Sequence, residues 1–174
     1  METEIKNVSR SIAFVGFVIG CIENDKGAAA ALRRADNPSM EYQSWEYLAR
    51  WRINLEKPNQ CLPFGLIAAA IVKGKIRKNG SLGIGEAIAR CYPKGNNSDQ
   101  AKSKLRRLLA CDTVSEVCSI LRPLLRLIEA KCNRVLNYAR LLDDIFYFES
   151  DSLRTKAKWA QSFYRTDVNE EVSP

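Results

Sequence analysis

The chain has 174 residues, of which 46% are hydrophobic, and this is enough to bury a core without metals or disulfides. It carries 27 Lys and Arg against 20 Asp and Glu, and the formal net charge of +7 favours a polyanionic partner. Histidine is absent, which excludes Ser-His and Cys-His nucleophile pairs and removes the commonest neutral nitrogen ligand of metals. The composition therefore argues against most hydrolases, and we predict no catalytic residue.

The cysteines lack the C-x-x-C spacing that lets two thiolates bind one zinc ion or form a redox turn. They stand at Cys21, Cys61, Cys91, Cys111, Cys118 and Cys132. Several lie within apolar stretches, where a free thiol behaves as a small hydrophobic group. We therefore predict structural thiols in a reducing cytoplasm, with no metal and no cofactor.

An apolar run from Ile12 to Ile22 raises the question of a membrane or secretory segment. The run is 11 residues long, against about 20 needed to span a bilayer. Small residues at 27–31 resemble a cleavage site, but Glu2 and Glu4 offset the basic residues before the run. The run is better interpreted as a buried helix of a protein without a membrane partner.

The spacing of apolar residues is helical almost throughout, which predicts an all-α protein without strands. A first helix is expected from Ile5 to Ile22, ended by residues 25–27. Residues 27–31 are expected to form an alanine-rich turn. Asn37 as a cap and Pro38 in a first turn predict a second helix that continues through Trp51.

A boundary between two small helical lobes is predicted near residue 94. Before it, Pro63 is expected to begin a helix, residues 73–80 to break it, and residues 81–92 to form a short helix. Residues 94–98 are the most linker-like stretch of the chain. We therefore divide the chain into an N-terminal lobe of residues 1–94 and a C-terminal lobe of residues 95–174.

Capping signals mark the helices of the second lobe. Ser98 is expected to cap one helix, and Thr113 with Glu116 fits a capping box that begins the next. Pro123 is expected to kink or split that helix, because proline lacks the amide proton of the helical ladder. Two further helices are expected at 136–148 and 152–164, the latter capped by Asp151, and the last nine residues are expected to fray.

Positive charge is concentrated between Lys73 and Arg107, a stretch with ten basic and two acidic residues. Such a stretch is typical of a surface that follows a phosphate backbone, although a solvated helical surface is the alternative. Arginine doublets add paired guanidinium groups that can fork onto phosphate oxygens. The candidate nucleic-acid-binding residues are Arg33, Arg34, Lys73, Lys75, Arg77, Lys78, Arg90, Lys102, Lys104, Arg106 and Arg107.

Two other patterns are interpreted as structural. Gly80, Gly83 and Gly85 follow a basic turn instead of a strand, and Ile88 stands where a dinucleotide-binding loop has its third glycine. The neighbouring Asp143 and Asp144 point about 100° apart on a helix, so we expect capping or ion pairing with Arg140.

The aromatic residues at helical spacing are assigned to the core, with base stacking as the alternative. They are Trp45, Tyr47, Trp51, Trp159, Phe163 and Tyr164.

Five sequence blocks occur in one order along the chain. They are Gly27-Ala-Ala-Ala-Ala-Leu-Arg-Arg34, Ser81-Leu-Gly83, Leu105-Arg-Arg-Leu-Leu109, Leu121-Arg-Pro-Leu-Leu125 and Trp159-Ala-x-x-Phe-Tyr164. Together they resemble the CasB family, the small subunit of the type I-E CRISPR interference complex Cascade. The resemblance implies a two-lobed helical subunit without catalytic activity. It also implies that two copies lie beside the large subunit and the backbone subunits that hold the guide RNA, where they steady target and displaced DNA strands in the R-loop.

The resemblance extends to individual positions. Arg33 and Arg34 match family arginines that face the displaced strand, and Lys104 matches a basic position on the inner face of the second lobe. Arg122 falls in a matching block and joins the candidate nucleic-acid-binding residues, although Pro123 stands where some relatives have a second arginine. Two alternatives stay open: a free-standing helical single-strand-binding protein and a scaffold without nucleic-acid contact.

Overall fold

The structure is a computed structural model that describes residues 9–166. Helices and short turns make up this part of the chain, which contains no strand and one isolated β-bridge, so the predicted all-α class is confirmed. None of its helices is long and apolar enough to cross a membrane.

The first two helices are set by side-chain caps. Helix α1 spans Arg10–Asn24 and begins where the Ser9 side chain accepts a hydrogen bond from the amide of Ile12. Helix α2 spans Lys26–Leu32 and begins where Asp25 accepts from the amide of Ala28. The predicted turn at 27–31 is therefore wrong, because a capped run of alanine, the best helix former, continues as a helix. The expected start of the first helix at Ile5 lies outside the described residues.

The predicted long helix over residues 38–51 is also wrong. The segment forms the 3-10 turn η1 (Glu41–Ser44), a single turn α3 (Trp45–Leu48) and the 3-10 turn η2 (Ala49–Trp51). The Asn37 side chain accepts hydrogen bonds from the amide and hydroxyl of Ser39, which favours a turn over a helical start. Arg52 has a left-handed backbone, with φ 56°, and ends the segment.

Helix α4 (Pro58–Lys73) is the most buried helix of the first half. It begins at Pro58, five residues before the predicted start at Pro63, which lies inside the helix. Proline suits this first helical position because its missing amide proton has no intrahelical acceptor there. Helix α4 contacts α1, α7 and α8, so it joins the two halves of the chain.

The second half of the chain is organised by capped helices. They are α5 (Ile84–Arg90), η3 (Gly95–Asn97), α6 (Asp99–Leu109), α7 (Val114–Lys131), α8 (Tyr138–Phe146), η4 (Phe148–Ser150) and α9 (Ser152–Tyr164). Ser98 caps α6 and Asp151 caps α9, as predicted. Thr113 and Glu116 form the predicted capping box at the start of α7.

Helix α7 runs unbroken through Pro123, so the predicted splitting is wrong. Pro123 is exposed, and so is Ser119 one turn earlier. Because Pro123 has no amide proton, the backbone carbonyl of Ser119 has no helical hydrogen-bond donor. Because that carbonyl can be hydrated, the helix continues at a lower cost than a buried proline would impose.

Two glycines allow close backbone contact near α5. The segment at 80–82 pairs with 135–137, through hydrogen bonds from Gly80 N to Leu136 O at 2.9 Å and from Asn137 N to Leu82 O at 2.9 Å. A Cβ atom on Gly80 would overlap the carbonyl of Val135, and one on Gly85 would overlap the carbonyl of Trp159. These glycines therefore serve backbone packing, in agreement with their structural interpretation.

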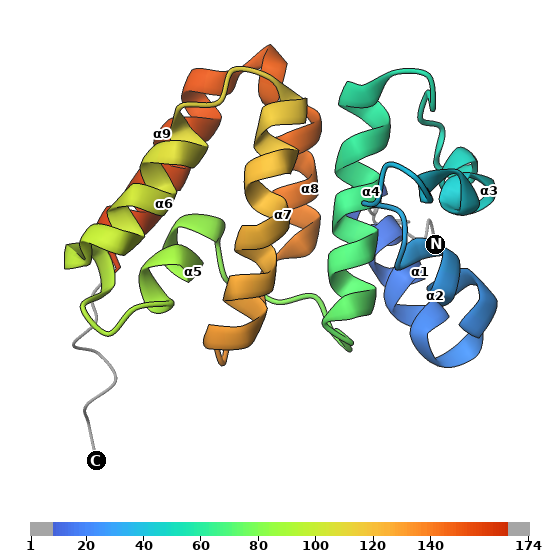
Figure 1. Ribbon diagram of the computed structural model, residues 1–174, viewed down its shortest axis with the longest axis horizontal. Helices are drawn as coiled ribbons and strands as arrows, with labels where there is room; N and C mark the ends of the chain where they lie inside the picture. Colours follow the sequence, from blue (N-terminus) through green and yellow to red (C-terminus); the bar gives the residue numbers. More distant parts are fainter. Residues whose placement is uncertain (1–8, 167–174) are drawn as a thin grey trace, which may run out of the picture.

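The helices form three neighbouring groups (Figure 1). Helices α1 to α4 lie on one side, α5, α6 and α9 on the other, and α7 and α8 between them. One continuous cluster of buried residues extends from Phe14 in α1 to Phe163 in α9. Helix α5 contacts α6, α7 and α9, and the division of the chain into lobes at residue 94 stays a prediction.

Candidate nucleic-acid interface

The Asp36 carboxylate forms ion pairs with basic side chains from two helices. Asp36 lies in the turn after α2, and its side chain is only 7% exposed. Lys73, at the end of α4, donates to both carboxylate oxygens at 2.8 and 2.9 Å. Arg122 of α7 places its Nε 3.8 Å from the same carboxylate, and this buried Nε has no hydrogen-bond partner among the described residues. The carboxylate thus draws two basic side chains together but leaves one donor unsatisfied.

An open basic groove of about 550 Å³ adjoins this cluster. Its cationic lining comprises Arg33, Arg34, Lys73 and Arg126. Arg34 donates from Nη1 to Gln43 at 2.9 Å, whereas Arg33 and Arg126 are exposed and make no side-chain hydrogen bond or ion pair with the described residues. Asp36 forms no ion pair with Arg33 or Arg34. Both guanidinium groups can therefore bind an anionic ligand.

A second groove, of about 240 Å³, lies between α6 and α7. Lys104 and Arg107 of α6 supply its charge. The opposite wall comes from α7 and comprises Ser119, Ile120, Pro123, Leu124 and Leu127. Two cations beside apolar surface suit a nucleic-acid strand, whose phosphates are charged and whose sugars and bases are partly apolar.

The exposed ridge of α7 separates the two grooves. Helical geometry places Ser119 and Pro123 on this ridge, with Arg122 and Arg126 on the flank toward α4. Helix α7 lies in front in Figure 1, between α4 and α6, so both grooves open along it. We name this surface the basic face and define it as Arg33, Arg34, Lys73, Lys104, Arg107, Arg122 and Arg126.

Three other predicted residues lie near the edge of the basic face. Lys75 and Arg77 line a groove with Arg33, and the Arg77 guanidinium lies 3.5 Å from the Glu23 carboxylate in an exposed pair. Lys78 is exposed in the loop that follows. Lys75 has a left-handed backbone, with φ 50°, where the chain leaves α4.

The remaining predicted residues point elsewhere. Lys102 and Arg106 lie on the side of α6 opposite to Lys104 and Arg107, because successive residues turn by about 100°. Arg90 donates to Glu86 at 2.8 Å, and Glu86 also accepts from Arg134 at 3.0 Å. The structure therefore brings seven basic residues together and separates these three from them.

Arg126 is a member of the basic face that the sequence prediction missed. It follows Arg122 by four residues on the same helix, so the two guanidinium groups lie one turn apart on one face. The four-residue spacing of these arginines could have identified Arg126 from the sequence.

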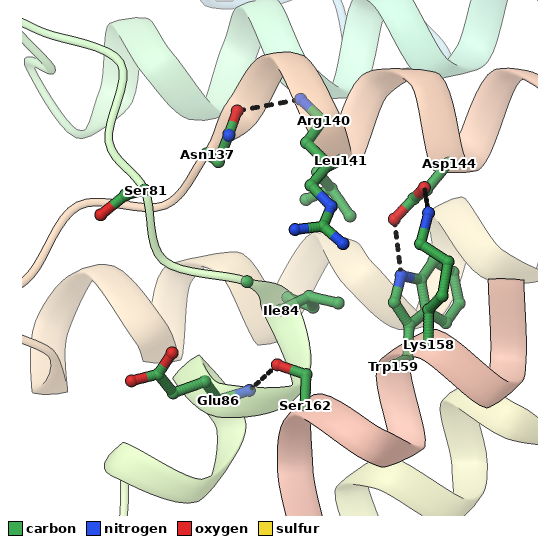
Figure 2. A pocket seen from close by; sticks show the side chains of 11 residues that line it. Ser81, Ile84, Glu86, Asn137, Arg140, Leu141, Asp144, Lys158, Trp159 and Ser162 are labelled. Carbon is green, nitrogen blue, oxygen red and sulfur yellow. Dashed lines mark hydrogen bonds and ion pairs between the residues drawn. The ribbon is translucent and has the colours of Figure 1, made fainter. Parts of the chain in front are cut away.

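A small polar pocket of about 140 Å³ lies between α5, α8 and α9 (Figure 2). In it, Asp144 accepts hydrogen bonds from Lys158 and from the Trp159 indole, both at 3.0 Å. Asp143 points elsewhere and accepts from Ser11. The aspartates are structural, as predicted, but their partners are not Arg140, whose guanidinium extends into the pocket without a carboxylate partner among residues 9–166 (Figure 2).

The aromatic residues divide between core and surface. Trp159 and Phe163 are buried, which confirms the core assignment for these two. Tyr47 and Trp51 are half-buried against the core. Trp45 and Tyr164 are exposed, by 38% and 52%, so the core assignment is wrong for these two.

The cysteines are free thiols, and five of the six are buried. Burial raises the pKa of Cys21, Cys61 and Cys111, and it raises the pKa of Cys118 to about 12. Within the part of the chain that the structure describes, no three Cys, Asp or Glu side chains come together in a way that would hold a metal ion.

The sequence profile described as CRISPR-associated protein Cse2 matches residues 28–164 of the chain. The chain belongs to the Cse2 family. This confirms the resemblance to CasB seen in the sequence blocks. No curated protein matches the chain in sequence.

Solved structures share the Cse2 fold with this chain. CasB from M. ruber superimposes with a TM-score of 0.71 at 24% identity, covering 91% of this chain and 94% of that chain. A Cse2-family protein from Thermus thermophilus gives a TM-score of 0.70 at 18% identity, with coverages of 88% and 97%. A chain of a CRISPR RNA-guided surveillance complex gives 0.67 at 24% identity, with coverages of 90% and 91%. These likenesses establish the fold.

Proposed function

We propose that this Cse2-family protein is a non-catalytic small subunit of a type I-E CRISPR Cascade complex in the cytoplasm. In this role it stabilises the R-loop through sequence-independent contacts to the target strand and the displaced strand. Its partners are a second copy of itself, the large subunit and the subunits that hold the guide RNA. Family membership and the likeness to a chain of an RNA-guided surveillance complex support the assembly.

The basic face is the observation that carries the DNA-binding part of the proposal. Its grooves present guanidinium and ammonium groups from the turn after α2 and from α4, α6 and α7, and Asp36 and Glu129 are the carboxylates that line them. Such groups hold phosphates and carry no information about base sequence. A rigid helical scaffold fixes their spacing, which lowers the entropic cost of binding a flexible strand.

The energetics of R-loops explain why such contacts matter. The guide–target heteroduplex is about as stable as the DNA duplex that it replaces, so contacts to the backbone decide which state is populated. A basic surface that binds the separated strands therefore shifts the balance toward the open state without reading any base.

A free-standing single-strand-binding protein is the alternative, because the same face would serve it. Copurification distinguishes the two functions. A Cascade subunit elutes with several larger proteins and a guide RNA, whereas a free-standing binder elutes alone.

The test compares two double variants with equal loss of charge in the reconstituted complex. Arg33→Ala with Arg126→Ala removes two exposed cations of the basic face, and Lys102→Ala with Arg106→Ala removes two cations outside it. We expect the first variant to assemble but to lose permanganate reactivity of the displaced strand. The control variant should keep wild-type reactivity. Equal reactivity in both variants, with both complexes intact, would refute the assigned role of the face.

A further inference from the structure

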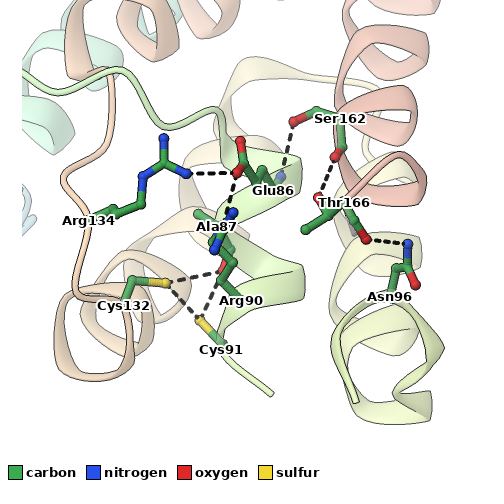
Figure 3. A network of polar contacts seen from close by, with 9 residues as sticks. All are labelled: Glu86, Ala87, Arg90, Cys91, Asn96, Cys132, Arg134, Ser162 and Thr166. Carbon is green, nitrogen blue, oxygen red and sulfur yellow. Dashed lines mark hydrogen bonds and ion pairs between the residues drawn. The ribbon is translucent and has the colours of Figure 1, made fainter. Parts of the chain in front are cut away.

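Cys91 and Cys132 form a thiol pair that the proposed function does not use (Figure 3). Their sulfur atoms lie 3.8 Å apart, although the residues are 41 positions apart in the sequence. Both thiols point toward the carbonyl of Ala87, with Sγ to oxygen distances of 3.2 and 3.3 Å. The two sulfurs are therefore held side by side by the end of α5 and the end of α7.

The surroundings make the two thiols unequal. Cys132 is half-buried, whereas Cys91 is only 7% exposed. A hydrogen bond from Cys91 lowers the pKa of Cys132, and the positive charge of Arg90 acts in the same direction, while burial and Glu86 act against them. The same hydrogen bond and burial raise the pKa of Cys91. Because the thiolate is the reactive form, Cys132 is the better nucleophile of the pair.

The backbone at the pair permits the small approach that a disulfide requires. An S–S bond is about 2.05 Å long, so the sulfurs must move closer by roughly 1.8 Å. Cys91 and Cys132 are the C-caps of α5 and α7, and Cys132 already has an extended backbone, with φ −90° and ψ 136°. Residues at helix ends adjust their dihedral angles without breaking interior hydrogen bonds.

We propose that Cys91 and Cys132 are a redox modification site that hydrogen peroxide converts to a reversible intramolecular disulfide. The Cys132 thiolate attacks one peroxide oxygen, the O–O bond breaks, and the sulfur becomes a sulfenic acid while hydroxide leaves and takes up a proton as water. Cys91 then gives up its proton and attacks the Cys132 sulfur, so that the S–S bond forms and a second water leaves. The two thiols are oxidised, peroxide is reduced to two waters, and a dithiol reverses the change by exchange.

The disulfide would fix the end of α7 to α5, against which α9 packs. The segment that follows Cys132 continues to Leu136, which pairs with the segment at 80–82. Helix α7 also carries Arg122 and Arg126. Oxidation would therefore restrict the helix that forms the ridge of the basic face.

The test treats the purified full chain with a modest molar excess of hydrogen peroxide and maps its thiols by differential alkylation and mass spectrometry. In the wild-type protein we expect two of the six thiols to be lost, a single disulfide that joins Cys91 to Cys132, and full recovery with dithiothreitol. Cys118→Ser is the matched control, because Cys118 is buried away from the pair, and it should form the same disulfide. In Cys132→Ser, Cys91 should stay reduced.

Three results would overturn the proposal. They are a disulfide between other cysteines, oxidation of Cys132 to sulfinic acid while Cys91 stays a thiol, and no loss of thiols in the wild-type protein. The wild-type measurement decides among these by itself, so the outcome does not depend on the folding of a variant. It also does not depend on DNA or on other subunits, and so its failure would leave the proposed function untouched.

Discussion

Asp36 shows how a single residue sets the charge of the basic face. Its carboxylate is nearly buried, and the two cations that approach it, Lys73 and Arg122, are 27% and 34% exposed. The cations are thus held in place by a partner that would itself repel phosphate. A carboxylate in this position favours folding and opposes nucleic-acid binding, and the two effects are separable by mutation.

Asp36→Asn should lower stability and strengthen nucleic-acid binding at the same time. The amide keeps the shape of the side chain but leaves Lys73 and Arg122 without an ionic partner, which should cost about 1–3 kcal/mol of unfolding free energy. Removal of one negative charge beside the phosphates should tighten binding by about two- to fivefold. Thermal unfolding and anisotropy titrations of single-stranded DNA measure both changes.

Asp112→Asn is the matched control for this substitution, because Asp112 is 87% exposed in its ion pair with Lys156. Asp112→Asn should change neither the unfolding free energy nor the affinity for DNA appreciably. Weaker DNA binding by Asp36→Asn, with the control unchanged, would contradict the proposed contact between DNA and the groove that Asp36 lines.

At the scale of elements, local signals identified three helix starts in the second half of the chain but not the irregular segments, and the cap predicted at Asn37 forms a turn instead. Ser98, Asp151 and the pair of Thr113 and Glu116 act within four residues of themselves, so their patterns predicted helix starts correctly. The turns at residues 41–51 depend on a side-chain turn at Asn37 and on packing against α4. Periodicity alone cannot report such tertiary contacts.

The glycines near α5 provide a test of element packing. Gly85→Ala should destabilise the protein by about 1–3 kcal/mol, because the new Cβ would meet the backbone of Trp159 and Phe163 in α9. Gly16→Ala is the matched control, since its Cβ would enter open space on α1, and it should stabilise by about 0.5–1 kcal/mol. Chemical denaturation of both variants gives the comparison. A Gly85→Ala variant as stable as the wild type would contradict the close contact between α5 and α9.

At the scale of the whole molecule, the basic face arises from segments that are distant in sequence. The sequence grouped basic residues by their position along the chain, and it placed Lys102, Lys104, Arg106 and Arg107 together. In the fold, these residues lie on two different sides of α6, and Lys104 and Arg107 lie on the same face as arginines of α7 and of the turn after α2. Charge density leads us to expect a polyanionic ligand, which stays a prediction, whereas the arrangement of the face required the tertiary structure.

The charge of the basic face predicts how binding depends on salt. If about five of its cations meet phosphates of a single strand, the slope of log K against log salt should be about −3.5. A fourfold increase in salt should then weaken binding by on the order of 100-fold. Titrations at several salt concentrations give the slope. A slope near zero would instead support a scaffold without nucleic-acid contact.

The most direct test of the central claim is site-specific photocrosslinking from the ridge between the two grooves. Ser119 is exposed there, and replacement by p-benzoylphenylalanine puts a reactive group between Arg126 and Arg107. The same replacement at Arg106, on the other side of α6, is the control. In a reconstituted complex with matched target DNA, we expect the probe at Ser119 to crosslink to DNA and the probe at Arg106 to give none. Crosslinks from Ser119 to protein alone, in a complex with a fully formed R-loop, would contradict the account.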